Sequence, residues 1–128
     1  MKNAIFLLTL CLFCCAQSLR AQSVDGDVTT IELVQTTGQF DTQRLDLKPG
    51  KYKFRVVNQG VEKDLGFVIQ RAADKDGDVM KTAVPNSFTT AYVKNGTAEY
   101  TGVVELKKGE YVYSCPLNPT PHYTIRVK

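Results

Sequence analysis

The chain has 128 residues, of which 43% are hydrophobic and 23% charged, and its 16 basic and 13 acidic side chains give a formal net charge of +3. A chain of this length forms one domain around one core. The near balance of charge, without a long basic run, argues against a nucleic-acid partner.

The first 21 residues have the composition of a secretory signal peptide. Lys2 supplies a positive start, and a 13-residue apolar run from Ala4 to Ala16 follows it. That run is shorter than the roughly 20 residues needed to cross a bilayer. We expect cleavage after Ala21, which makes the protein periplasmic or secreted and leaves no transmembrane segment in the mature chain.

Three of the four cysteines, Cys11, Cys14 and Cys15, leave with this segment. Lipid anchoring is the less favoured alternative, because it requires a small residue before the modified cysteine and Cys14 follows Phe13. Cleavage leaves 107 residues, with 14 basic side chains against 13 acidic ones. Cys115 then has no intramolecular partner, so it serves a metal, redox chemistry or an intermolecular bridge, or is simply buried.

Residues 22–29 are expected to form a loose N-terminal arm ahead of a single domain at 30–128. Beyond the arm, apolar and polar residues alternate with the period of β-strands. The residues predicted to share one face of a strand are Ile31 and Leu33; Leu45 and Leu47; Tyr52, Phe54 and Val56; Phe67 and Ile69; Ala98, Tyr100, Gly102, Val104 and Leu106; Tyr111, Tyr113 and Cys115; and Tyr123, Ile125 and Val127.

Turn sequences separate these segments: LKPGK at 47–51, NQG at 58–60, NG at 95–96 and KKGE at 107–110. The NG pair begins a glycosylation acceptor pattern, but a hairpin turn is the simpler interpretation. Residues 72–88 break the strand rhythm, and we expect a loop with a short helical turn there. About seven to eight short strands at this spacing predict an all-β, Greek-key β-sandwich.

One acidic segment invites comparison with calcium-binding loops. Asp74, Asp76 and Asp78 have the spacing of the first three ligands of an EF-hand. Val79 stands where the loop requires glycine, and Pro85 where it requires glutamate. A solvated turn is therefore the better interpretation.

Three segments resemble the cupredoxin-like family, which is the fold of the blue copper proteins. LKPGKYKFRVVNQG is similar to the family's third strand, and YTIRV to its closing strand. LKKGEYVYSCP is similar to the strand that runs into the copper-binding cysteine, which here is Cys115. The resemblance covers residues 30 to 128 and implies a cupredoxin-like sandwich with copper binding or electron transfer.

The resemblance also implies where the other copper ligands would stand. The family's first histidine falls on Asp64 or Leu65, its second on Asn118, and its axial methionine close to Pro121. None of these positions holds the expected ligand. A type 1 copper site needs two histidines, and His122 is the chain's only one. The resemblance therefore implies a degenerate copper site.

Two interpretations of the cysteine loop remain open. Cys115 and His122, with Met80 recruited from the irregular segment, could hold Cu(I), because thiolate and thioether ligands select that ion. His122 could equally be an ordinary strand residue. Pro116 and Pro119 stiffen the loop, which suits either a preorganised site or a rigid binding surface.

No enzyme motif accompanies these residues, so we expect no catalytic site and no required cofactor. Three hypotheses follow. The first is a non-enzymatic binding or accessory protein for an unknown protein partner or a second copy of the chain. The second is an atypical copper-binding or electron-transfer protein that uses Cys115 and His122. The third is a thiol role in which Cys115 bridges to another chain.

Overall fold

The computed structural model describes residues 22–128, so the predicted signal peptide and its cysteines lie outside the described residues. One sheet runs in the order β1 (Gln22–Asp25), β2 (Val28–Thr36), β5 (Gly50–Asn58) and β7 (Ala98–Tyr100), with β3 (Gln39–Phe40) beside β2 and β8 (Val104–Leu106) beside β5. The other runs β4 (Arg44–Leu47), β10 (Tyr123–Val127), β9 (Gly109–Ser114) and β6 (Val68–Arg71).

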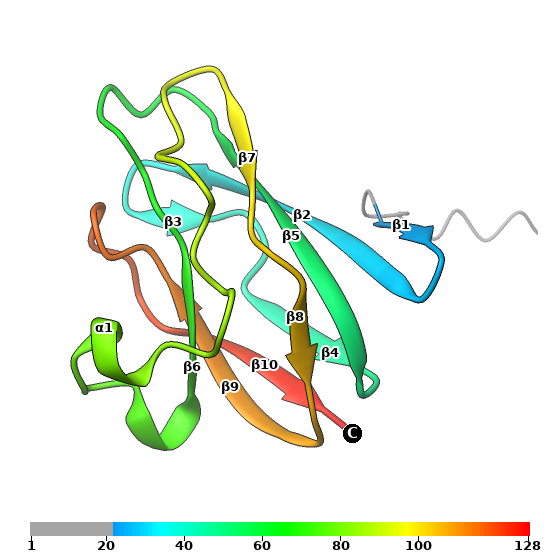
Figure 1. The fold of residues 1–128 in the computed structure, drawn as a ribbon. Coiled ribbons are helices and arrows are strands. Elements are labelled where there is room, and N and C mark those ends of the chain that lie inside the picture. The colour runs from blue at the N-terminus through cyan, green and yellow to red at the C-terminus, as the bar shows by residue number, and fades with distance from the viewer. Residues whose placement is uncertain (1–21) are drawn as a thin grey trace, which may run out of the picture.

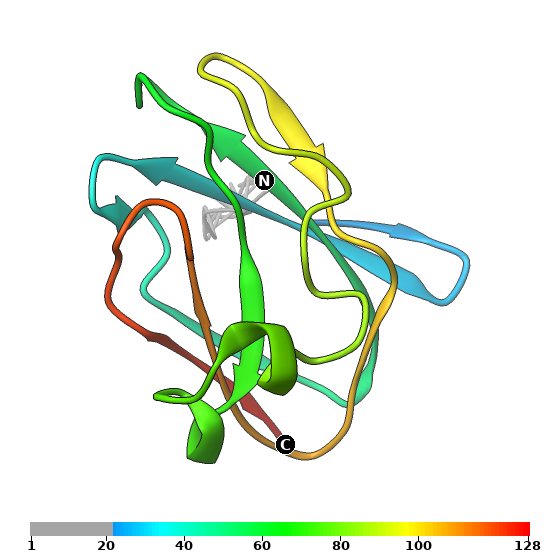
Figure 2. The ribbon, with the colours of Figure 1, turned by 60° about the vertical axis from the view of Figure 1, so that its left-hand side comes forward.

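The two sheets form separate layers of a β-sandwich (Figures 1 and 2). β2 pairs with β5 in parallel, as β4 does with β10, and the other ladders are antiparallel. The chain crosses between the layers repeatedly, because β4, β6 and β9 belong to one sheet while β5 and β8 belong to the other. This arrangement confirms the predicted all-β sandwich.

The irregular segment after β6 closes one side of the sandwich. It contains a 3-10 turn (Ala72–Asp74) and the helix α1 (Val79–Thr82), as predicted for residues 72–88. Ala83 bridges to Gln70 in β6, and Thr89 bridges to Thr101 just after β7. The segment therefore ties an edge of each sheet to the other (Figure 2).

Burial along the strands confirms most of the predicted faces. The buried residues that the alternation predicted are Ile31, Leu33, Leu45, Tyr52, Phe54, Val56, Phe67, Ile69, Val104, Leu106, Tyr111, Tyr113, Cys115, Tyr123, Ile125 and Val127. They belong to one continuous core between the sheets.

Aromatic rings from both sheets form the centre of that core. Phe54 of β5 stacks on Phe67 at 5.4 Å between ring centroids. Phe40 of β3 meets Tyr113 of β9 edge-on at 5.3 Å, and Tyr113 lies 5.4 Å from Tyr123 of β10. Such pairs each add about 0.5–1.5 kcal/mol beyond the area that they bury. The cluster therefore fixes one sheet against the other.

Two predicted features differ from the structure. Residues 22–25, expected in a loose arm, instead form β1, which pairs with β2 through a turn at Gly26, where φ is +63°. The single strand expected over residues 98–106 is divided into β7 and β8. The added strand, the divided strand and the short β3 bring the described residues to ten strands.

A β-bulge explains the divided strand. The three residues 101–103 oppose only Lys53 and Phe54 of β5, so the alternation shifts by one position. Tyr100, expected in the core, is 43% exposed beneath Lys53, whose Nζ lies 5.5 Å from the ring centroid. Thr101 is buried instead, and its Oγ1 accepts a hydrogen bond from the Phe54 amide at 3.0 Å.

The acidic segment forms turns of its own. The Gly77 amide donates to the Asp74 carbonyl at 2.9 Å, and the Asp78 carboxylate caps α1 by accepting from the Met80 amide at 2.9 Å. The NG pair also lies in a turn, where Gly96 has φ +76°. This turn leads into β7, which pairs with β5, so it does not join two strands of a hairpin.

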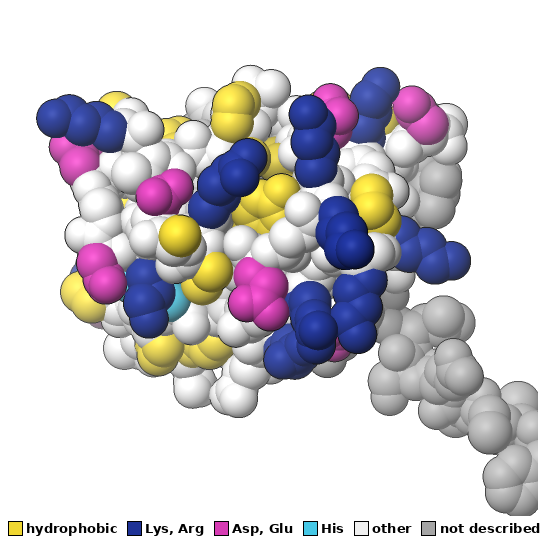
Figure 3. Space-filling model, turned by 90° about the horizontal axis from the view of Figure 1, so that it is seen from below, with side chains coloured by type: hydrophobic (Ala, Val, Ile, Leu, Met, Phe, Trp, Pro, Cys, Tyr) yellow, Lys and Arg dark blue, Asp and Glu magenta, His cyan; other side chains and the backbone are white. Residues whose placement is uncertain are grey.

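The end of the sandwich farthest from Cys115 carries mixed charge. It holds the turns at 47–51 and 107–110, and basic side chains there alternate with carboxylates (Figure 3). Lys51 pairs with Asp27 at 3.4 Å and Arg126 with Glu110 at 4.0 Å. Among the described residues, no helix has the length and apolar character needed to cross a membrane.

Tyr52 is expected to make stability pH-dependent. Burial of its phenol, whose hydroxyl donates to the Lys48 carbonyl, raises its pKa above the ordinary 10.0. The folded state therefore keeps a proton that the unfolded state releases, and this contribution falls as pH rises above about 10. Tyr52→Phe should lose about 1 kcal/mol at neutral pH and show a shallower alkaline loss in urea unfolding.

Tyr92→Phe is the matched control, because Tyr92 is 65% exposed. Parallel alkaline slopes for wild type and Tyr52→Phe would contradict the assignment.

Candidate functional site

β9 delivers Cys115 to one end of the sandwich, where three connections meet. These are residues 37–38 between β2 and β3, residues 59–67 between β5 and β6, and residues 115–122 between β9 and β10. Each connection joins strands whose register is fixed by the sheets. The end is thus assembled from segments that are remote in sequence.

The sulfur of Cys115 is a buried hydrogen-bond acceptor. The residue is 4% exposed and belongs to the core. Its Sγ accepts from the Asn118 amide at 3.1 Å and from the Gly66 amide at 3.4 Å. The Cys115 amide in turn donates to Thr120 Oγ1 at 3.1 Å. These bonds fold residues 115–120 into a compact turn and tie it to the connection before β6.

Asn58 organises the neighbouring connection. Its side chain is fully buried, and Nδ2 donates to the carbonyls of Val61, Lys63 and Val93, each at 3.1 Å. Its Oδ1 accepts from the Val61 amide at 2.9 Å. One amide side chain is therefore hydrogen-bonded to four backbone groups. These bonds fix the conformation of the connection between β5 and Leu65.

The positions where the resemblance expects ligands hold other side chains. Leu65 is fully buried and bridges to Val93 through two backbone hydrogen bonds, of 3.0 and 2.9 Å. Asn118 is 4% exposed, and its Nδ2 donates to the Thr36 carbonyl at 3.4 Å. Pro121 is exposed. Two of the three positions are therefore filled by buried side chains.

His122 and Met80 lie apart from the buried sulfur environment. His122 is exposed immediately before β10, and Met80 is 77% exposed on α1. Pro116 and Pro119, which frame the turn, are exposed as well. Within residues 22–128, no three side chains of His, Cys, Asp or Glu are arranged so that they could hold a metal ion.

Gln35 is a feature of this end that sequence reasoning missed. It is fully buried on β2, opposite Phe40 of β3 and Asn58 of β5. Neither Nε2 nor Oε1 of Gln35 has a hydrogen-bond partner in the described part of the chain. The signal was present, because Gln35 continues the face set by Ile31 and Leu33.

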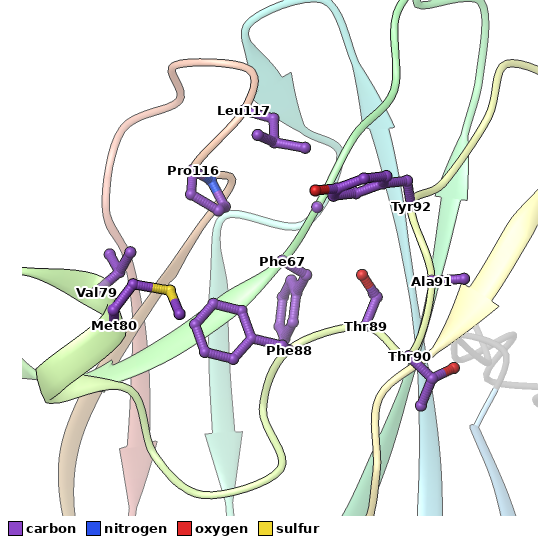
Figure 4. Close-up of a pocket in the computed structure, with 11 residues that line it drawn as sticks. Phe67, Val79, Met80, Phe88, Thr89, Thr90, Ala91, Tyr92, Pro116 and Leu117 are labelled. Atoms are coloured by element: carbon purple, nitrogen blue, oxygen red, sulfur yellow. The ribbon is translucent and has the colours of Figure 1, made fainter.

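An apolar pocket lies beside Cys115. It has a volume of about 560 Å³, and Figure 4 shows Phe67 and Phe88 at its centre. Pro116 and Leu117, which directly follow Cys115, form one wall, and Met80 lines it too. The structure thus places Met80 and the cysteine turn around the same hollow.

Solved blue copper proteins have the same fold. Auracyanin A, a blue copper protein from the green thermophilic photosynthetic bacterium Chloroflexus aurantiacus, aligns with a TM-score of 0.63 at 12% identity, over 79% of this chain and 99% of its own. Auracyanin B aligns with a TM-score of 0.60 at 15% identity, over 84% of this chain and 94% of its own. No family model matches the sequence, and no curated protein matches it significantly. The likeness confirms the predicted cupredoxin-like fold.

The side chains at this end do not fit a type 1 copper site, which needs two imidazoles and a thiolate. Cys115 supplies the thiol, but Leu65 has no donor atom and the Asn118 amide is hydrogen-bonded. The unpartnered amide of Gln35 offers at most a weak oxygen ligand. The fold is therefore kept while the ligand set that defines its copper centre is incomplete.

Replacing Cys115 should loosen the two amides that its sulfur accepts. Cys115→Ala leaves the Gly66 and Asn118 amides without an acceptor, which should lower the free energy of unfolding by about 2 kcal/mol. Cys115→Ser keeps an acceptor atom and should lose less. Amide hydrogen exchange at both residues, measured by NMR, should quicken more in the alanine variant. Equal exchange in the two variants would count against the bonding role of the sulfur.

Gln35 should be a source of instability. Gln35→Met keeps the length of the side chain and removes two buried polar atoms that have no partner, so the free energy of unfolding should rise by about 1–3 kcal/mol. Gln70→Met is the matched control, because Gln70 Oε1 is also buried without a partner among the described residues, whereas its Nε2 donates to the Asp74 carbonyl and to Thr82 Oγ1. In chemical denaturation, the free energy of unfolding should therefore rise in Gln35→Met and fall in Gln70→Met. A loss of stability in Gln35→Met would refute the destabilising role of Gln35.

Proposed function

We propose that this chain is a small exported cupredoxin-fold protein that acts as a non-enzymatic binding or accessory protein. It binds through the end of the sandwich that carries Cys115, and it does so without a type 1 copper site. The observation that carries this proposal is the filling of the ligand positions by Leu65 and Asn118, both buried and held by backbone contacts.

A second observation supports a binding role at this end. The described residues include five large hydrophobic side chains that are exposed to solvent, and Met80, Tyr92 and Leu117 line the pocket beside Cys115. Exposed apolar side chains that cluster around one hollow are typical of an interaction site. At the opposite end, the hollow beside Pro49 and Leu106 is lined by the charged side chains of Asp27, Lys51, Glu105, Lys107 and Lys108 as well.

Copper binding is the second candidate function, and the position of Cys115 favours it. Its sulfur lies at the end of β9 in a fold shared with blue copper proteins, and thiolate is a ligand that selects Cu(I). His122 belongs to the same connection, and Met80 lies on the pocket that Pro116 borders. A rebuilt site would have to move His122 or recruit a second chain.

The third hypothesis, a bridge from Cys115 to another chain, receives less support. A residue that is 4% exposed must be uncovered before its thiol can react with a second thiol. An unknown protein partner or a homodimer that docks without a covalent bond remains part of the proposal.

Anaerobic copper titration separates the two leading functions. We expect the reduced protein to take up no stoichiometric copper and to show no thiolate–copper absorption, since it lacks the second imidazole. Cys115→Ser and His122→Ala should behave as wild type does. Binding of one copper per chain, or per pair of chains, that disappears in both variants would replace the proposed function by the copper-binding one.

A further inference from the structure

The pocket beside Cys115 has walls that are already fixed in position. Phe67 at its centre is fully buried and stacks on Phe54, and the neighbouring Gly66 amide is bonded to Cys115 Sγ. The facing wall is held to β7, because the Thr90 amide donates to the Tyr100 carbonyl at 2.9 Å. Pockets that bind small molecules are usually formed in advance in this way.

The lining of the pocket carries no charge. None of its eleven residues is Asp, Glu, Lys, Arg or His. Its side-chain polar groups are two threonine hydroxyls and the phenol of Tyr92. Thr90 Oγ1 is bonded to the Tyr100 carbonyl, whereas the Thr89 hydroxyl points toward the hollow in Figure 4. A charged ligand would lose its hydration here without gaining a partner.

The shape and the side chains favour a ring system. The rings of Phe67, Phe88 and Tyr92 surround the hollow, and the Met80 sulfur lies at its edge (Figure 4). Aromatic rings prefer stacked or edge-on ring partners, and thioether sulfur also contacts rings favourably. A volume of about 560 Å³ is in the range of small-molecule sites, which span roughly 300–1,000 Å³.

We propose that this pocket is a binding site for an uncharged aromatic small molecule that carries at most one or two hydrogen-bonding groups. The ring system lies against Phe88 and Tyr92, between Met80 and the wall formed by Pro116 and Leu117, and a polar group meets Thr89. The inference deepens the proposed function, on which it rests in placing the binding activity at the Cys115 end. A concave pocket whose walls are held in place is a better match for a small molecule than for the surface of another protein.

Two fluorescent probes with one ring system test the proposal. N-phenyl-1-naphthylamine is uncharged, and 1-anilinonaphthalene-8-sulfonate adds a single negative charge to the same rings. With protein purified from cells that express the full chain, the uncharged probe should bind saturably at one per chain. The sulfonate should bind at least about tenfold more weakly, because no cationic side chain lines the pocket.

Variants at the rim locate the site. Met80→Asp and Leu117→Asp place a carboxylate beside the pocket at exposed positions that tolerate it, and each should weaken the uncharged probe about tenfold or more. Val103→Asp is the matched control, since Val103 is a 39% exposed apolar residue outside the lining. It should leave probe binding unchanged. Unaltered circular dichroism and melting temperature show that each variant is folded.

Three results would overturn the inference: no saturable binding, equal affinity for both probes, or the same loss in Val103→Asp as in the rim variants. None of them depends on copper, so the ligand inference and the proposed function can fail separately. If the protein bound neither copper nor the uncharged probe, the small-molecule site would be refuted. A macromolecular partner would then be left as the occupant of this end.

Discussion

The buried sulfur of Cys115 holds the end of the sandwich together. It accepts hydrogen bonds from two backbone amides, that of Gly66 in the connection before β6 and that of Asn118 in its own turn. The Gly66 contact spans 49 positions in the sequence. Because a buried amide without an acceptor is costly, this one atom determines how the two connections approach each other. Gly66 and Phe67 from one connection, and Pro116 and Leu117 from the other, therefore come together in the lining of the apolar pocket.

Where the resemblance expects a copper-binding cysteine, the structure gives the sulfur of Cys115 two backbone amide donors. The thiol already has a structural role as an acceptor at the junction of two loops. Leu65 adds apolar contacts there, and Asn118 ties the cysteine turn to the Thr36 carbonyl. Each of these side chains stabilises the junction by burial or hydrogen bonding, and neither offers an imidazole.

The two ends of the sandwich are chemically different. One end alternates lysines with carboxylates in ion pairs such as Lys51 with Asp27, an arrangement that is typical of a solvated surface. The other gathers exposed apolar side chains around a hollow with a fixed centre. The aromatic core between them runs from Phe54 through Phe67 to Tyr113, and Phe67 also belongs to the lining of that hollow. The proposed binding function is therefore assigned to the Cys115 end.

The sequence by itself determined most of the residues that face the core, because strand alternation is a local property with a period of two. It also determined the turns at 47–51 and 58–60 and, through three segments, the resemblance to the cupredoxin fold. The bulge at 101–103 escaped prediction, because an extra residue is defined only by the partner strand that it opposes. The strand at 22–25 was not predicted for the same reason, since the composition of these four residues does not indicate that they pair with β2.

The candidate site was predictable only in part. The sequence singled out Cys115 and its proline-rich turn, and it showed that histidines are missing from the expected positions. Only the tertiary structure decided that the sulfur accepts two amides, that Gln35 is buried without partners, and that Met80 faces the same hollow as Leu117. These facts depend on segments far apart in the chain that meet when the two sheets pack. No local pattern can encode that meeting, because it is set by the packing of the whole core.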